Sequence, residues 1–191
     1  LALRDRDAQT LAAFDADHAD ALKAVMAGQY RAAMQGQQIR AAAAARGIQL
    51  FGDMPLFVAH DSADVWAQRH LFLLDADGHP TVVAGVPPDY FSETGQRWGN
   101  PHYDWDAMRA DGFAWWRQRL AAHFEWFDLV RIDHFRGLLA SWEIPANEPT
   151  AIHGHWVEGP GAALLQTVAD AMGELPLVAE DLGIITPEVT A

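Results

Sequence analysis

Apolar residues recur every three to four positions in some segments and form short runs in others, which predicts an α/β chain. Gly28 and Gly47 follow two of the helical segments and are expected to end them. Ser62 is expected to cap a short helix, and a further helix is expected to begin at Pro187. Helices are predicted over residues 7–27, 29–46, 104–127 and 161–173, and strands over residues 48–53, from 129 onward and over 176–183.

The alternation of strands and helices favours a parallel sheet built from strand–helix–strand units. Three strands do not distinguish an open doubly wound sheet from part of a barrel. No glycine-rich phosphate loop follows a strand, which disfavours nucleotide binding. Residues 75–103 are rich in turn residues and are predicted to be irregular. Such a long irregular segment inside a compact domain is typically functional, and this one carries several aromatic side chains.

Composition narrows the possible partners. The 191 residues carry a formal net charge of −13, which argues against a nucleic-acid partner and against an anionic membrane surface. The absence of cysteine excludes disulfides, thiolate metal sites and a cysteine nucleophile, and it fits a cytoplasmic location. No apolar run approaches the ~18 residues of a membrane span.

Each predicted strand ends in acidic residues, namely Asp53, Asp133 and the pair Glu180-Asp181. Active sites of parallel α/β proteins lie beyond the carboxyl ends of the strands, so these acids are expected to face one pocket. The alternative is that each acid caps the helix that follows it.

Arg131 and Asp133 are two positions apart on a strand and therefore share a face. An arginine beside an aspartate keeps the carboxylate ionised, as a nucleophile or a stabiliser of positive charge requires. Glu180 follows apolar residues, which favour the protonated form that a general acid requires. Two carboxyl groups with different roles are typical of glycoside chemistry. An ordinary buried ion pair between Arg131 and Asp133 is the alternative.

The histidines suggest a metal site only weakly. His153 and His155 lie in a turn-rich loop and have no third ligand at a recognisable spacing. We therefore expect neither a metal nor a cofactor, although a metal-dependent α/β enzyme remains an alternative.

Four segments together resemble the amylomaltases, also called disproportionating enzymes or 4-α-glucanotransferases. They are GDMPLFVAHDSADVWA (52–67), GVPPDYFSETGQRWGNPHYDW (85–105), LVRIDHFRG (129–137) and LVAEDLG (177–183). The resemblance implies part of a (β/α)8 TIM barrel, with about three consecutive strands, their helices and a long lid-like loop. It also implies that residues 1–191 form a single fragment of the catalytic barrel domain, within which residues 75–103 are an irregular loop that covers glucan.

The resemblance further implies a role for individual residues. Asp133 matches the nucleophile and Glu180 the general acid/base of a retaining double displacement. The residues that match substrate-binding positions are Asp53, Asp89, Tyr90, Phe91, Trp98, Asn100, Arg131 and His134.

The implied activity is that of a cytoplasmic glycosyltransferase of starch, glycogen and maltodextrin metabolism. It would transfer α-1,4-glucan segments between maltooligosaccharides, with glucose as an acceptor and without a cofactor. The alternatives are a hydrolase similar to α-amylase and a non-catalytic fragment that binds glucan.

The family's third catalytic carboxylate is a later aspartate that follows a histidine, and the 191-residue sequence ends before any such segment. We therefore expect the isolated chain to be inactive, or nearly so, on maltotriose. Robust release of glucose together with longer maltodextrins would contradict this expectation.

Overall fold

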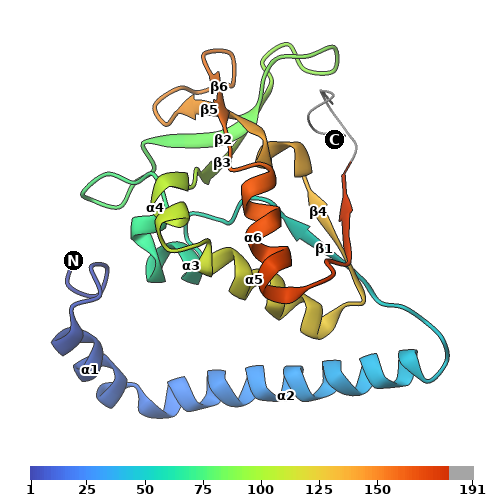
Figure 1. The fold of residues 1–191 in the computed structure, drawn as a ribbon. Coiled ribbons are helices and arrows are strands. Elements are labelled where there is room, and N and C mark those ends of the chain that lie inside the picture. The colour runs from blue at the N-terminus through green and yellow to red at the C-terminus, as the bar shows by residue number, and fades with distance from the viewer. Residues whose placement is uncertain (181–191) are drawn as a thin grey trace. The chain divides into compact units, whose positions relative to one another are not determined.

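The computed structural model describes residues 1–180, so Asp181 and the helix expected from Pro187 lie outside the described residues. The chain divides into two compact units, Leu1–Leu50 and Phe51–Ala191 (Figure 1). The prediction of one catalytic domain over residues 1–191 concerns how these units combine, and it stays a prediction.

The first unit consists of α1 (Ala8–Asp17) and α2 (Ala19–Ala44). The prediction that Gly28 ends a helix is wrong, because α2 continues through it. The helical segment is interrupted at His18 instead, between α1 and α2. A glycine inside a helix costs only ~1 kcal/mol relative to alanine, and the surrounding alanine-rich sequence tolerates that cost. The predicted stop at Gly47 is confirmed, because α2 ends just before it and Gly47 has a φ of +67°.

A three-stranded parallel sheet forms the centre of the second unit. Its strands are β1 (Phe51–Pro55), β4 (Leu129–Asp133) and β7 (Leu177–Ala179), in the spatial order β1-β4-β7. The three predicted strands are therefore confirmed, although β1 begins three residues later than expected. Asp53 pairs with Arg131 in the register of β1 and β4, which places both residues at the same level of the sheet.

The helices of the second unit are short. They are α3 (Ala63–Ala67), α4 (Trp105–Ala110), α5 (Ala114–Trp126) and α6 (Ala162–Met172), with 3₁₀ turns η1 (Arg69–Leu71) and η2 (Phe135–Leu138). Ser62 caps α3 as predicted, because its hydroxyl accepts a hydrogen bond from the Val65 amide. α5 packs against β1, β4 and α6 (Figure 1).

The single helix predicted over residues 104–127 is instead two helices. α4 ends in a Schellman motif, in which Gly112 has a φ of +66° and the Phe113 amide donates to the Met108 carbonyl at 2.8 Å. The Asp111 carboxylate then accepts a hydrogen bond from the Ala114 amide at the start of α5. The buried residues on either side of this break, Met108 and Phe113, are five positions apart, so the three-to-four spacing of a single helix is interrupted here.

A second, antiparallel sheet comes from segments for which no strand was predicted. Its strands are β2 (Val82–Val86), β3 (Gln96–Pro101), β5 (Ala140–Pro145) and β6 (His155–Glu158), in the order β3-β2-β5-β6. Residues 75–103 are thus partly ordered, since they contain both β2 and β3. The central pairing joins β2 to β5, which are far apart in sequence, and local pattern does not reveal such a pairing.

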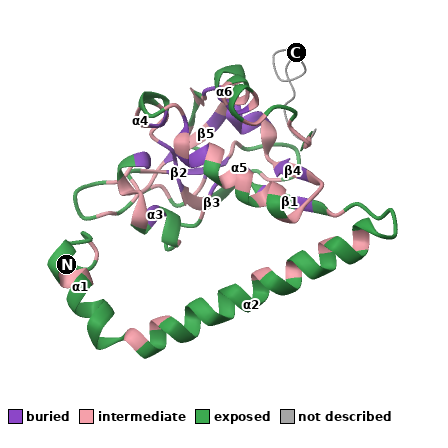
Figure 2. Cartoon of the chain, turned by 60° about the horizontal axis from the view of Figure 1, so that its bottom comes forward, coloured by how far each residue is buried: buried purple, intermediate pink, exposed green. Residues whose placement is uncertain are grey.

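The core lies between the parallel sheet and its helices, and buried residues concentrate in this unit (Figure 2). Met54, Ile132 and Trp116 are almost completely buried there. Because side chains alternate along a strand, Asp53 and Arg131 project from the other face of the sheet. Within residues 1–180, no helix is long and apolar enough to cross a membrane.

Matched glycine substitutions test the boundaries of α2. We expect Gly28→Ala to raise the free energy of unfolding by about 0.5–1 kcal/mol, because an added Cβ meets open space inside a regular helix. Gly47→Ala should lower it by about 1–2 kcal/mol, because alanine is strained at a positive φ. Urea unfolding followed by circular dichroism at 222 nm measures both, and destabilisation by Gly28→Ala would instead place a helix end at Gly28.

Candidate active site

One guanidinium joins the acids at the carboxyl edge of the parallel sheet. Arg131 Nη1 lies 2.6 Å from Asp53 Oδ1, and Arg131 Nη2 lies 2.8 Å from Asp133 Oδ1 and 3.1 Å from Glu180 Oε1. The prediction that the strand-end acids face one pocket is confirmed for Asp133 and Glu180, which line a common cavity, whereas Asp53 contacts Arg131 without lining that cavity. The predicted shared face of Arg131 and Asp133 is confirmed as well.

The alternative, that these acids act as helix caps, finds no support at Asp133. His134 is the N-cap of η2, and no side-chain capping bond is present there.

The shared nitrogen limits the distance between two of the carboxylates. Asp133 Oδ1 and Glu180 Oε1 both contact Arg131 Nη2, at 2.8 and 3.1 Å, so these two oxygens lie at most 5.9 Å apart. Two carboxylates this close repel each other, and the guanidinium between them offsets that repulsion.

Glu180 sits in a polar setting rather than the apolar one that its sequence neighbours suggested. Its side chain is 15% exposed, and its carboxylate accepts a hydrogen bond from the His134 amide in addition to the Arg131 contact. The Glu180 amide donates to the Ile132 carbonyl, which continues the pairing between β4 and β7. The neighbouring strand therefore fixes the position of this carboxylate.

The neighbouring carboxylates stabilise the protonated form of Arg131. The hydrogen bond to Asp53, followed by the charges of Asp53 and Asp133, raises the pKa of Arg131, while desolvation opposes the shift. The guanidinium is therefore a permanent positive charge in the site.

His134 occupies a conformation that few non-glycine residues adopt. Its φ is +57° and ψ is +41°, in the left-handed region. Its ring packs edge-on against Trp98, with centroids 4.9 Å apart. Burial, together with the nearby charge of Arg136, lowers the pKa of His134 to about 4, so the ring is neutral at pH 7.

Two cavities border these groups. One, of about 490 Å³, is lined by several predicted site residues, namely Asp89, Phe91, Trp98, Asp133, His134 and Glu180. The other, of about 260 Å³, shares Trp98, Asp133 and His134 with the first and adds Asn100. Among the predicted site residues, Asp53, Tyr90 and Arg131 line neither cavity. Arg131 nevertheless contacts Asp133 and Glu180, which line the larger cavity, and Asp53 contacts Arg131.

The turn between β2 and β3 presents two aromatic side chains to solvent. Tyr90 is 97% exposed and Phe91 is 92% exposed, and their rings contact each other edge to face. Asp89 shapes this turn, because its carboxylate accepts hydrogen bonds from the Phe91 and Ser92 amides at 2.8 Å. Asn100 has a comparable structural bond, from its side-chain amide to the Val58 carbonyl.

The predicted site residues include neither Arg136 nor Trp156. Both residues line the larger cavity, together with Gln96. Arg136 lies three positions after Asp133, which is the only local signal for it. Trp156 gives no local signal, because the pairing of β5 with β6 brings it to the cavity.

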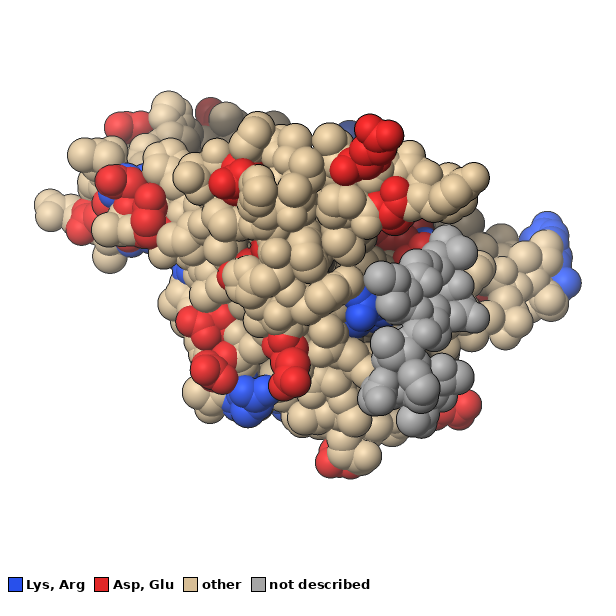
Figure 3. Space-filling model, turned by 90° about the horizontal axis from the view of Figure 1, so that it is seen from above, with Lys and Arg blue, Asp and Glu red and all other residues tan. Residues whose placement is uncertain are grey.

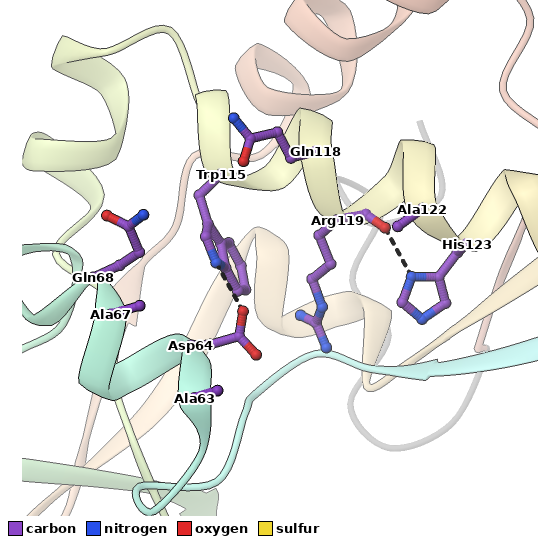
Figure 4. Close-up of a pocket in the computed structure, with 9 residues that line it drawn as sticks. All are labelled: Ala63, Asp64, Ala67, Gln68, Trp115, Gln118, Arg119, Ala122 and His123. Carbon is purple, nitrogen blue, oxygen red and sulfur yellow. Dashed lines mark hydrogen bonds between the residues drawn. The ribbon is translucent and has the colours of Figure 1, made fainter. Parts of the chain in front are cut away.

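A separate hollow of about 440 Å³ lies between α3 and α5 (Figure 4). Several of its polar groups are hydrogen-bonded within the protein. Trp115 donates to Asp64, and His123 is bonded to the Arg119 carbonyl (Figure 4). Arg119 also donates to the Pro55 and Leu56 carbonyls. The hollow contains none of the predicted site residues. The hydrogen bonds from Arg119 fix the backbone at the end of β1.

Acidic groups dominate the charge of the chain. On the face shown in Figure 3, acidic side chains are scattered over the surface and basic ones are few. Among residues 1–180, no cluster of three or more histidines and acids has an arrangement that could hold a metal ion.

Paired carboxylates at the carboxyl edge of parallel strands, beside a cavity lined by aromatic residues, are an arrangement typical of α/β proteins that act on glycosidic bonds. A family model described as 4-alpha-glucanotransferase matches residues 1–191. The chain belongs to this family.

Individual relatives agree with this assignment. A 4-alpha-glucanotransferase of Thermus thermophilus is 61% identical over 80% of this chain and 31% of its own length. One of Streptococcus pneumoniae is 49% identical over 97% of this chain and 37% of its own. An amylomaltase of Streptococcus agalactiae, solved in complex with acarbose, superposes with a TM-score of 0.96 at 39% identity, over 99% of this chain and 38% of its own. The chain thus spans about a third of the length of these relatives.

The buried histidine makes stability depend on pH. Below pH ~6.5 the unfolded state binds a proton that folded His134 does not bind until about pH 4, so the free energy of unfolding falls as pH is lowered across this window. Urea unfolding at several pH values should show this dependence. In His134→Asn, the total fall in the free energy of unfolding between pH ~6.5 and about pH 4 should be smaller by up to roughly 3 kcal/mol. Asparagine tolerates the left-handed backbone, and His102, whose pKa burial also lowers to about 4, stays in both proteins. Equal slopes in the two proteins would contradict the assigned pKa of His134.

Proposed function

We propose that the complete protein carrying this chain is a 4-α-glucanotransferase that transfers α-1,4-glucan segments between maltooligosaccharides with retention of configuration. The observation that carries the proposal is that one Arg131 nitrogen bridges Asp133 and Glu180, which keeps the two bridged oxygens within 5.9 Å of each other. Retaining glycoside chemistry uses carboxyl groups ~5–5.5 Å apart, and two carboxylates bridged by a single nitrogen can adopt that spacing.

The first half of the reaction breaks the glycosidic bond. Glu180, in its protonated form, gives its proton to the glycosidic oxygen while Asp133 attacks the anomeric carbon. The reducing-end portion leaves as an alcohol, and the donor sugar is held as an ester of Asp133. In the second half, ionised Glu180 removes the proton from the 4-hydroxyl of an acceptor such as glucose, which attacks the ester and restores Asp133.

The surrounding contacts suit these changes of charge. Arg131 stabilises whichever of the two carboxylates is ionised, because one of its nitrogens contacts both. The His134 amide donates to Glu180 and so holds the acid/base in place when it is ionised. Asp53 anchors the other arm of the guanidinium.

The aromatic turn between β2 and β3 explains why transfer exceeds hydrolysis. Tyr90 and Phe91 are almost fully exposed in the free protein, so a bound glucan is the surface that they can cover. Covering the site excludes water from the ester and leaves the acceptor sugar as the competing nucleophile. The whole segment 75–103 then serves as the glucan-covering loop.

The remaining features of the proposal follow from composition and site chemistry. The partners are neutral α-1,4-glucans rather than nucleic acid or membrane, and the acidic charge of the chain supports this. The reaction uses no cofactor, because the carboxylates supply both the nucleophile and the proton. A cytoplasmic place in starch, glycogen and maltodextrin metabolism, within a TIM-barrel domain, completes the proposal. The chief rival is a hydrolase similar to α-amylase, which shares the carboxylates and differs in its acceptor.

Replacing the nucleophile tests the mechanism. In the full-length protein, Asp133→Asn should lower the rate of maltotriose disproportionation roughly a thousandfold or more, because an amide cannot form the glycosyl ester. The matched control is Asp106→Asn, which removes an exposed carboxylate of α4 and should leave the rate unchanged. Mass spectrometry of acid-quenched mixtures should detect the ester only when Asp133 is present. Wild-type rates in Asp133→Asn would refute its role.

Replacing the exposed aromatics tests the covering turn. The double variant Tyr90→Ala/Phe91→Ala should raise hydrolysis relative to transfer several-fold, because water then reaches the ester. Each hydrolysis adds a reducing end and each transfer conserves their number, so a reducing-sugar assay combined with chromatography separates the two reactions. Tyr30→Ala, at an exposed position of α2, is the control. An unchanged ratio in the double variant would count against the covering role.

A further inference from the structure

Arg136 is a buried cation that the proposed mechanism does not use. Its side chain belongs to η2 and lines the larger cavity together with Asp133 and Glu180. The residue is only 7% exposed, and its Nε and Nη1 have no hydrogen-bond partner within residues 1–180. In the same part of the chain, Asp133 and Glu180 are paired with Arg131.

Trp156 covers this guanidinium. The Arg136 Cζ lies 4.1 Å from the centroid of the Trp156 ring, a close cation–π contact. Trp142 contacts the same indole edge to face and is itself held by a hydrogen bond to the Ala151 carbonyl. Gly154 leaves no room beside Trp142 for a larger residue. The indole is thus held in place, and the residue remains 39% exposed at the cavity.

Packing between Arg136 and Trp156 accounts for the position of the guanidinium plane, but it gives the guanidinium N–H groups no hydrogen-bond acceptor. Stacking satisfies the face of the guanidinium, but its N–H groups point outward in the plane and need oxygen acceptors. Buried donors without acceptors are costly and rare, and an acceptor that comes with a ligand would satisfy them.

The charge of the cavity defines that ligand. Asp89, Asp133 and Glu180 line the same cavity, so an anionic ligand would be repelled. A neutral molecule rich in hydroxyl oxygens satisfies the guanidinium without this repulsion. The exposed part of an indole in turn packs well against the C–H groups of a sugar ring. Both features fit a pyranose.

We propose that Arg136 and Trp156 form a sugar-binding wall that holds one pyranose ring of the glucan beside the two carboxylates. The guanidinium donates to sugar hydroxyls, and the indole packs against the ring. This inference rests on the proposed function and adds two specificity-determining residues to it. Because Nε and Nη1 are closed to solvent in the free protein, binding shifts the guanidinium against the indole and changes the fluorescence of Trp156.

Steady-state kinetics of the full-length protein separate this wall from the reacting groups. The wall contacts the sugar equally in the ground state and the transition state, so its loss raises KM and leaves kcat nearly unchanged. Arg136→Met should raise the KM for maltotriose about tenfold or more, as expected for loss of charged hydrogen bonds. Arg136→Lys keeps the positive charge, so its KM should lie between those of the wild-type protein and Arg136→Met. The control is Arg109→Met, which removes an exposed arginine of α4.

A binding measurement makes the test independent of turnover. Maltoheptaose is titrated into Asp133→Asn by calorimetry and by tryptophan fluorescence, with and without Arg136→Met or Trp156→Phe. Weaker binding in both variants, and loss of most of the fluorescence change in Trp156→Phe, would support the wall. The double variant should lose less than the product of the two single effects, because the side chains act together.

The outcomes distinguish this inference from the proposed function. If wild-type protein transfers glucan and both Arg136 variants keep the wild-type KM and maltoheptaose affinity, the wall is refuted and the function stands. If wild-type protein binds maltoheptaose through Arg136 but does not transfer, the function is refuted and the wall stands. If Arg136→Met does not fold, Arg136→Lys decides: wild-type KM and affinity in it refute the wall, and a raised KM supports it.

Discussion

The guanidinium of Arg131 holds three carboxylates at one edge of the parallel sheet, and the rest of the site depends on this contact. Asp53, Asp133 and Glu180 come from three strands and would repel one another without it. The strand register sets the geometry, since Asp53 lies directly opposite Arg131. A shift of one residue would turn these side chains toward the apolar core.

The second constraint is the antiparallel sheet that covers the site. Two connections of the parallel sheet supply its strands, and they meet where β2 pairs with β5. This pairing brings Trp98 from β3 and Trp156 from β6 to one cavity. The parallel sheet thus provides the charged groups, and the antiparallel sheet provides aromatic walls. The division suits a neutral sugar polymer, which needs both stacking surfaces and a few ionisable groups.

The outcome for individual elements shows what local pattern can reveal. The parallel strands were predictable because apolar runs with an acidic end are distinctive, and the end of α2 was predictable from Gly47. Gly28 was misleading, because a glycine ends a helix only when the surrounding sequence does not sustain it. The break at Gly112 was missed because the regular apolar spacing of α5 was extended back over α4, although Asp111-Gly112 is a local turn signal.

The sequence alone determined the α/β class, the acids at the strand ends and the family resemblance, because strand periodicity and contiguous motifs are local properties. Tertiary structure decided how those residues meet. It placed Glu180 against Arg131 and the His134 amide, where the sequence suggested apolar surroundings. It also enclosed Arg136 beneath Trp156. These outcomes depend on pairing between distant segments, and a side chain's electrostatic surroundings are set by neighbours in space rather than in sequence.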